Sequence, residues 1–276
     1  MKRAVDEVYK EADSGKKIYT YGPIIHNDEV VKDLERKGVT TIREDSVLER
    51  LSSEDVVIIR SHGITKETMA LLEATGATLI DMTCPFVKRI HNLVLEHKED
   101  YNVVIVGDPV HPEVVAIKSY GDAATRVVAS VQDAMQYVPE KEKPIFIVSQ
   151  TTFNLNKFQE ILAILEKKEY YSTVVNTICD ATRKRQEEAK RVSSAVDKMV
   201  VIGDLKSSNS RKLYEICKEV CEDTYFVQTA EELRMQGGDL QPTSSCMTSM
   251  TVGITAGAST PNNIIEEVQK YVRNDF

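Results

Sequence analysis

The stretch Asn102-Val-Val-Ile-Val-Gly-Asp-Pro-Val-His-Pro-Glu113 decides the fold class of this chain. A short β-rich run ends at Gly107 and passes into a polar turn that carries His111 and Glu113. The same order recurs along the chain: a β-rich run, a polar turn, and then a stretch with helical spacing of its apolar residues and many Glu and Lys. This alternation predicts an α/β protein with mainly parallel sheets.

Nine runs have the composition of strands, and the stretches between them have that of helices. The predicted strands are Lys17–Ile25, Asp55–Arg60, Ala77–Asp81, Asn102–Gly107, Pro144–Ser149, Thr173–Ile178, Met199–Gly203, Thr224–Gln228 and Met250–Thr255. The predicted helices are Met1–Ala12, Asn27–Lys37, Lys66–Ala74, Phe86–His97, Asn154–Lys167, Ala181–Val196, Ser210–Val220 and Pro261–Val272. We therefore expect three similar α/β domains, residues 1–83, 84–178 and 179–276, and a surface loop over Gln236–Ser249.

Length and composition describe an ordinary folded protein. The chain has 276 residues, of which 42% are hydrophobic and 28% charged. No run approaches the roughly 20 apolar residues of a spanning helix, and the N-terminus lacks the apolar segment of a signal peptide, so we expect a cytoplasmic protein without membrane contact. A net charge of −8 argues against a broad nucleic-acid surface and favours a small-molecule partner. Five cysteines at irregular spacings predict reduced thiols rather than a disulfide framework.

Polar residues gather where the predicted strands end, and ligands of open parallel sheets bind beyond these carboxyl ends. Three of the five histidines, His26, His62 and His111, follow predicted strands. One such histidine alone would more often bond a backbone carbonyl or cap a helix. Three together favour a site for a multiply charged anion such as a diphosphate, because histidine donates hydrogen bonds and carries positive charge when protonated.

Two segments have the composition of anion cradles at helix N-termini. Lys206–Ser210 runs directly into a predicted helix, and Thr255–Pro261 combines small residues with the hydroxyls of Ser259 and Thr260. Backbone N–H groups and hydroxyls at such points bind anions. Either segment alone is equally consistent with ordinary helix capping.

Glu113 and Thr151 are the candidates for proton transfer. Glu113 follows His111 by two residues and precedes an apolar stretch, which suits proton delivery in a dry pocket. The alternative is a glutamate favoured in a first helical turn by the helix dipole. Thr151 and Thr152 could position a proton, although hydroxyl pairs are also common in structural turns.

Cys84 and Cys179 are the cysteines that follow predicted strands, each at a proposed domain boundary. Thiolates ligate iron–sulfur clusters or zinc, so these two residues are candidate metal ligands. The alternative for each is a small apolar residue. Cys217 and Cys221 lie four residues apart on a predicted helix and are assigned to the core, and Cys246 lies in the predicted loop.

The order of these motifs resembles one family, 4-hydroxy-3-methylbut-2-enyl diphosphate reductase. The motifs are I-I-H-N, S-H-G, D-M-T-C-P, H-P-E-V, S-Q-T-T, I-C-D-A-T-R-K-R-Q, S-S-N-S and T-A-G-A-S-T-P. The resemblance implies three α/β domains arranged as a trefoil around a central 4Fe-4S cluster. It further implies reductive removal of the allylic hydroxyl with two electrons and two protons, giving isopentenyl and dimethylallyl diphosphate in the methylerythritol phosphate route of isoprene biosynthesis. The electrons would come from a ferredoxin or flavodoxin type donor.

Carried onto this sequence, the resemblance assigns a role to each candidate residue. Glu113 and Thr151 would serve the proton path, and Cys84 and Cys179 would ligate iron. The diphosphate would be held by His26, His62, His111, Ser207, Ser208, Asn209 and Ser259.

The sequence departs from the family pattern at its start. Family members carry a strand and a G-F-C-x-G-V segment with a third cluster cysteine, whereas this sequence begins with the residues expected just after that segment. We therefore expect an N-terminally truncated chain whose first domain lacks that strand, and a cluster-free diphosphate-binding form is the alternative function. A phosphosugar or nucleotide transferase is disfavoured because no glycine-rich G-x-G-x-x-G or P-loop pattern follows any predicted strand.

Overall fold

The computed structural model describes residues 2–25, 27–139, 142–168, 170–236 and 250–274. The chain divides into two compact units, Met1–Ile178 and Cys179–Phe276. The first unit contains two four-stranded sheets and the second unit one three-stranded sheet, and every strand pair is parallel. The predicted α/β class with parallel sheets is therefore confirmed. In the part of the chain that the structure describes, no helix is both long and apolar enough to cross a membrane.

The first sheet has the strand order β2-β1-β3-β4. Its elements are α1 (Lys2–Ala12), β1 (Lys17–Tyr21), α2 (Asp28–Arg36), β2 (Thr40–Ile42), the 3-10 helix η1 (Asp45–Arg50), β3 (Asp55–Ile59), α3 (Lys66–Ala74) and β4 (Thr78–Asp81). Alternate residues of β3 enter two different cores. Val56 and Ile58 pack with α1 and α2, and Val57 and Ile59 pack with η1 and α3. Both faces of the sheet are therefore covered, as expected for parallel strands.

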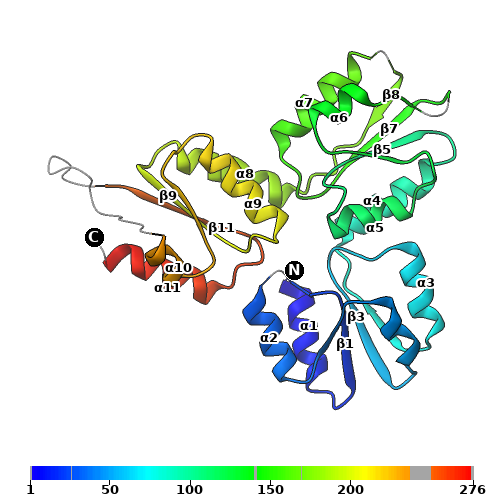
Figure 1. Cartoon of the computed structure of the whole chain (residues 1–276), viewed down its shortest axis with the longest axis horizontal. Helices are drawn as coiled ribbons and strands as arrows, with labels where there is room; N and C mark the ends of the chain where they lie inside the picture. Colours follow the sequence, from blue (N-terminus) through cyan, green and yellow to red (C-terminus); the bar gives the residue numbers. More distant parts are fainter. Residues whose placement is uncertain (1, 26, 140–141, 169, 237–249, 275–276) are drawn as a thin grey trace. The chain divides into compact units, whose positions relative to one another are not determined.

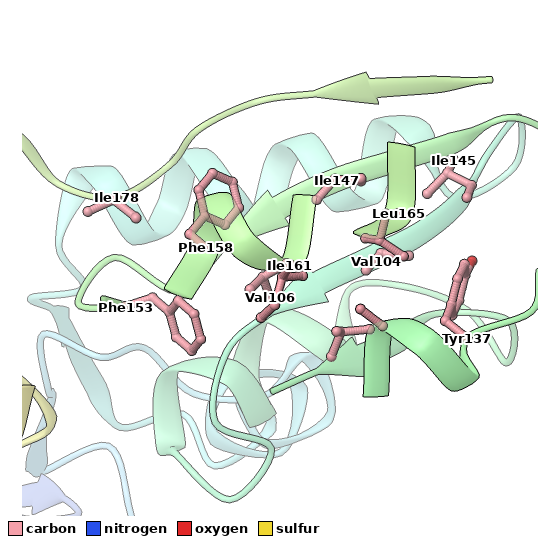
Figure 2. Close-up of a cluster of buried hydrophobic side chains, with 12 residues drawn as sticks. Val104, Val106, Tyr137, Ile145, Ile147, Phe153, Phe158, Ile161, Leu165 and Ile178 are labelled. Carbon is pink, nitrogen blue, oxygen red and sulfur yellow. The ribbon is translucent and has the colours of Figure 1, made fainter. Parts of the chain in front are cut away.

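The second sheet has the order β6-β5-β7-β8. Its elements are α4 (Pro85–His97), β5 (Asn102–Val106), α5 (Pro112–Ser119), β6 (Arg126–Val128), α6 (Val131–Gln136), β7 (Ile145–Ser149), α7 (Leu155–Glu166) and β8 (Ser172–Val174). Figure 2 shows the core on the α6–α7 face, where Val104 and Val106 of β5 share one cluster with Ile161 and Leu165 of α7. The other residues of β5, Val103 and Ile105, pack against α4 and α5.

The second unit is built on the order β10-β9-β11. Its elements are α8 (Asp180–Ser193), β9 (Lys198–Ile202), α9 (Ser208–Lys218), β10 (Thr224–Val227), α10 (Ala230–Met235), β11 (Val252–Ala256) and α11 (Asn262–Asn274). Figure 1 shows α8 and α9 on one face of this sheet and α10 and α11 on the other. The two faces bury separate cores, with Met199 and Val201 on the α8–α9 side and Val200 and Ile202 on the other.

The structure adds short elements that the sequence pattern does not predict. These are the three-residue edge strands β2 and β6, η1, and the helices α5, α6 and α10. The first predicted strand also ends earlier, at Tyr21, because Gly22 adopts a positive φ of 71° and Pro23 follows. Most of the predicted loop Gln236–Ser249 lies outside the described residues.

Candidate active site

The loop between β5 and α5 presents His111 and Glu113 at the carboxyl edge of the second sheet. His111 is the N-cap residue of α5, and its Nδ1 accepts a hydrogen bond of 3.1 Å from the backbone N–H of Glu113. Nδ1 therefore carries a lone pair, which places the proton of the neutral ring on Nε2. Pro112 occupies the first helical turn, where a missing N–H costs nothing.

The Glu113 carboxylate is buried and bonded to a residue from the neighbouring strand end. The backbone N–H of Thr151 donates to Oε1 at 2.6 Å, and the Thr151 hydroxyl donates to Oε2 at 2.8 Å. Burial raises the pKa of Glu113 to about 7, although the two bonds from Thr151 favour the ionised form. Glu113 can therefore exchange a proton near neutral pH, which is the property required of a general acid or base.

Gln150 holds the Glu113 loop in place, a role that the sequence analysis did not assign. Its side chain is buried, its Oε1 accepts from the N–H of Asp108 at 3.1 Å, and its Nε2 donates to the Thr152 hydroxyl at 3.0 Å. A Cβ on Gly107 would lie 3.0 Å from the Gln150 Cβ. The backbone therefore approaches Gln150 closely at this glycine. The S-Q-T-T motif contains Gln150, but only the long-range bond to Asp108 reveals its role.

His62 lies against His111 in the first unit. The two rings form an edge-to-face pair with centroids 5.3 Å apart and an interplanar angle of 90°. His62 sits in a turn closed by a bond of 3.1 Å from the N–H of Gly63 to the carbonyl of Arg60. The next strand end joins this turn, because the N–H of Cys84 donates to the carbonyl of Ser61 at 3.0 Å.

Cys84 and Cys179 occupy equivalent positions in their respective units. Each is the N-cap residue of a helix, α4 for Cys84 and α8 for Cys179, and neither side chain makes a capping hydrogen bond. Both are partly exposed free thiols. Each sulfur therefore lies at the positive end of a helix and is not used as a cap.

Cys217 and Cys221 are of a different kind. Both are buried, and their Sγ atoms contact backbone carbonyls, that of Cys217 at 3.8 Å from Ala189 and that of Cys221 at 3.7 Å from Asp197. Burial also raises the pKa of Cys217 to about 11, which favours the neutral thiol. Within the described ranges no three His, Cys, Asp or Glu side chains gather closely enough to hold a metal ion. Cys246 lies outside those ranges.

The N-terminus of α9 forms a buried polar cradle in the second unit. Ser207 caps the helix, with its hydroxyl accepting from the N–H of Ser210 at 3.4 Å. Ser208 and Asn209 follow in the first turn, and Ser259 lies in the segment after β11. All five residues are at most 5% exposed. Free N–H groups and the helix dipole make such a terminus suitable for an anion.

Ser210 joins the cradle to both neighbouring strand ends. A Cβ on Gly203, which follows β9, would lie 2.6 Å from the Ser210 Cβ, and a Cβ on Gly257, which follows β11, would lie 3.2 Å from it. Either added atom would also overlap the Ser210 hydroxyl. The small residues at these two strand ends therefore allow α9 to approach the sheet edge.

Two polar atoms of the cradle have no protein partner in the described structure. These are the amide nitrogen of Asn209 and the hydroxyl of Ser210, both fully buried. A buried polar group without a hydrogen bond is costly, and most such groups in folded proteins are satisfied. Buried donors that the protein itself leaves unsatisfied are the feature expected of a site that binds an anionic ligand.

The predicted site residues thus fall into two groups. In the first unit, the structure brings His62, His111, Glu113 and Thr151 together, with Cys84 beside the His62 turn. In the second unit, α9 gathers Ser207, Ser208 and Asn209, and Ser259 follows the adjacent strand. Cys179 begins that unit, and His26 lies outside the described residues.

Parallel α/β sheets, partly exposed thiols at helix N-termini, a buried polar cradle and a carboxyl group with a pKa of about 7 are together typical of an α/β enzyme. The family described as LytB protein matches residues 1–273. The chain therefore belongs to the LytB family, and the resemblance predicted from the motifs is confirmed.

Relatives in other organisms carry the name 4-hydroxy-3-methylbut-2-enyl diphosphate reductase. The protein of Caldanaerobacter subterraneus subsp. tengcongensis is 44% identical, over 99% of this chain and 92% of its own length. That of Thermoanaerobacter sp. (strain X514) is 42% identical, again over 99% of this chain and 92% of the relative.

Two solved structures are also similar. The E-1-hydroxy-2-methyl-but-2-enyl-4-diphosphate reductase of Plasmodium falciparum superposes with a TM-score of 0.87 at 27% identity, covering 99% of this chain and 83% of the other. The second is (E)-4-hydroxy-3-methyl-but-2-enyl diphosphate reductase, described as the terminal enzyme of the non-mevalonate pathway. It has a TM-score of 0.64 at 37% identity and covers 98% and 95% of the two chains.

Proposed function

We propose that this chain is a reductase that converts 4-hydroxy-3-methylbut-2-enyl diphosphate into isopentenyl and dimethylallyl diphosphate. Two electrons and two protons enter, the allylic C–O bond breaks, and the hydroxyl leaves as water. Membership of the LytB family supports the reaction. The observation in this chain that carries the proposal is the buried pair of unsatisfied polar atoms, Asn209 Nδ2 and Ser210 Oγ, at the N-terminus of α9.

The diphosphate is bound by hydroxyl, amide and imidazole groups. Ser207, Ser208, Asn209 and Ser259 provide the cradle in the second unit, and His26, His62 and His111 provide donors in the first. Because Nδ1 of His111 accepts the N–H of Glu113, Nε2 carries the proton of the neutral ring and is its donor atom. Charge-assisted hydrogen bonds of this kind favour the charged phosphate oxygens over a neutral group of the same shape.

Glu113 supplies the proton that the departing hydroxyl requires. Its carboxyl group is dry and has a pKa of about 7, so the protonated and ionised forms are both accessible at neutral pH. Thr151 holds both oxygens and fixes the direction in which the carboxyl faces. Proton transfer by a positioned group of matched pKa contributes about 10²- to 10⁴-fold to the rate.

Cys84 and Cys179 fit as ligands of a 4Fe-4S cluster, since both thiols are partly exposed and neither is used as a cap at its helix N-terminus. When bound, such a cluster supplies electrons and an iron that can accept the substrate hydroxyl. The described residues contribute two thiolates, whereas the family pattern uses three. A ferredoxin or flavodoxin type protein would serve as the electron donor.

Anaerobic purification followed by iron, sulfide and turnover measurements tests this function. We expect iron and sulfide in the protein, and conversion of the substrate diphosphate to both products with a chemical reductant. Calorimetry with inorganic diphosphate measures the cradle separately. Protein that binds diphosphate but contains neither iron nor sulfide and shows no turnover would instead be the cluster-free binding form.

A further inference from the structure

Arg60 follows β3 directly, at the carboxyl edge of the first sheet. Its guanidinium lies over the backbone of Gly22, which follows the neighbouring strand β1. A Cβ on Gly22 would lie 2.9 Å from the Arg60 Cζ and would overlap one of its terminal nitrogens. Gly22 also adopts a left-handed φ of 71°, which favours glycine. A glycine at this position therefore allows both the turn of the backbone and the close approach of the arginine.

This cation has no carboxylate partner among the described residues. Its Nε is fully buried without a hydrogen-bond acceptor, and its one electrostatic neighbour of note is the phenol of Tyr21. Burial lowers the pKa of the guanidinium, which records the cost of holding the charge there. Lys88, by contrast, is paired with Asp81 at 2.6 Å.

Arg60 is only partly exposed, and charges withdrawn from water in proteins are normally paired because an isolated one is costly. An uncompensated guanidinium at the ligand-binding edge of a parallel sheet therefore points to an anion that comes from outside the chain. The position agrees with this interpretation. The carbonyl of Arg60 accepts the N–H of Gly63 and so closes the turn that carries His62.

We propose that Arg60 is an additional substrate-binding residue, whose guanidinium, held in the space that Gly22 leaves open, binds anionic oxygens of the diphosphate group. This inference rests on the proposed function for the identity of the substrate, and the chemical class that it requires is a phosphate or diphosphate ester. The planar guanidinium fork matches two phosphate oxygens at once, which a lysine ammonium cannot do.

The test compares Arg60→Met and Arg60→Lys with the control Arg43→Met. Arg43 follows β2 at the same edge of the same sheet, but it is exposed. Each protein is titrated with inorganic diphosphate by calorimetry and assayed for kcat and KM. We expect Arg60→Met to weaken diphosphate binding and raise KM by about 10- to 100-fold, with kcat within about twofold. Arg60→Lys should recover part of the loss, and Arg43→Met should match the wild type.

A second variant acts on the same space without removing the charge. In Gly22→Ala the new methyl group displaces the guanidinium and also strains the left-handed backbone, so we expect weaker diphosphate binding and a lower Tm in the wild-type background. In the Arg60→Met background the same change should leave the affinity unaltered. Gly22→Ala displaces the guanidinium and Arg60→Lys replaces it with an ammonium group. If Arg60→Met does not fold, these two variants still show whether diphosphate binding depends on the Arg60 guanidinium.

If Arg60→Met lowers the Tm but leaves diphosphate affinity and KM unchanged, Arg60 has a structural role and the inference is overturned. Turnover by the wild-type protein would in that case leave the proposed function intact. Conversely, wild-type protein without turnover, whose diphosphate binding still depends on Arg60, would support the inference and contradict the proposed function.

Discussion

Two helix N-termini at carboxyl edges of parallel sheets, those of α5 and α9, use their polar side chains in opposite ways. At α5 the polar groups satisfy one another: Glu113 accepts two bonds from Thr151, and its own N–H donates to His111. At α9 the amide nitrogen of Asn209 and the hydroxyl of Ser210 are buried without a partner among the residues that the structure describes.

The difference separates a group that holds a proton from groups that hold a ligand. A carboxyl group that must protonate near pH 7 needs burial and a fixed orientation, and the bonds from Thr151 provide the orientation. Donors that must bind an anion are more useful when no protein acceptor competes for them. The comparison predicts that a change at Glu113 affects turnover and that changes at the N-terminus of α9 affect affinity.

The largest expected effect is that of Glu113→Gln. The amide keeps the shape of the side chain but cannot release a proton, so we expect kcat to fall by about 10²- to 10⁴-fold while inorganic diphosphate binds with unchanged affinity. Single-turnover kinetics and calorimetry measure the two quantities. Glu160→Gln, an exposed position on α7, is the matched control. An equal loss of diphosphate affinity would show that Glu113 binds the substrate instead.

The pH dependence of stability is the second test of the α5 site. Below pH 4.5, the ordinary pKa of the side chain, Glu113 is protonated in both the folded and the unfolded chain. Between pH 4.5 and about 7 the unfolded chain releases the proton and the folded chain retains it, so the free energy of unfolding falls as pH rises. The full change is at most about 3 kcal/mol.

Urea unfolding of wild-type and Glu113→Gln protein between pH 4.5 and 8 measures this contribution. The wild-type curve should decline relative to the variant across this range, and turnover that depends on protonated Glu113 should decline as pH rises through about 7. Parallel stability curves would contradict the raised pKa.

Packing around Ser210 gives the third effect. Gly257→Ala overlaps the Ser210 hydroxyl, and we expect the free energy of unfolding to fall by about 1–3 kcal/mol. Ser210→Ala removes the clashing hydroxyl and leaves 3.2 Å between the two Cβ atoms, so the double variant should recover most of the loss. Gly203→Ala should not be rescued in this way, because its Cβ would remain 2.6 Å from that of residue 210. Equal rescue of both would contradict the described approach of α9 to β9.

The smallest effect is that of the helix caps. Ser207→Ala and Ser130→Ala each remove an N-cap hydroxyl, of α9 and α6 respectively, and each should cost about 1 kcal/mol in stability. Only Ser207→Ala should also weaken the binding of inorganic diphosphate. If both variants bind diphosphate as the wild type does, Ser207 is a cap alone.

The sequence predicts the buried strands well because their signal is local. Val103–Val106 and Met199–Ile202 are continuous apolar runs that both faces of a sheet bury completely. The edge strands β2 and β6 are three residues long, which is too short to show a strand pattern in the sequence. They form because they pair with β1 and β5 in the folded chain. The short helices α6 and α10 are missed for the same reason: six residues show too little periodicity to be distinguished from a turn.

The sequence by itself determined the α/β class, the family, and the set of residues that follow the strands, because strand periodicity and motif order are properties of neighbouring residues. Only the tertiary structure decided what those residues can do. Glu113 has a pKa of about 7 because the fold buries it against Thr151, 38 positions away. The side-chain amide nitrogen of Asn209 and the hydroxyl of Ser210 lack partners among the described residues because of what surrounds them in space. Burial and hydrogen bonding depend on contacts between distant segments, and no local pattern records them.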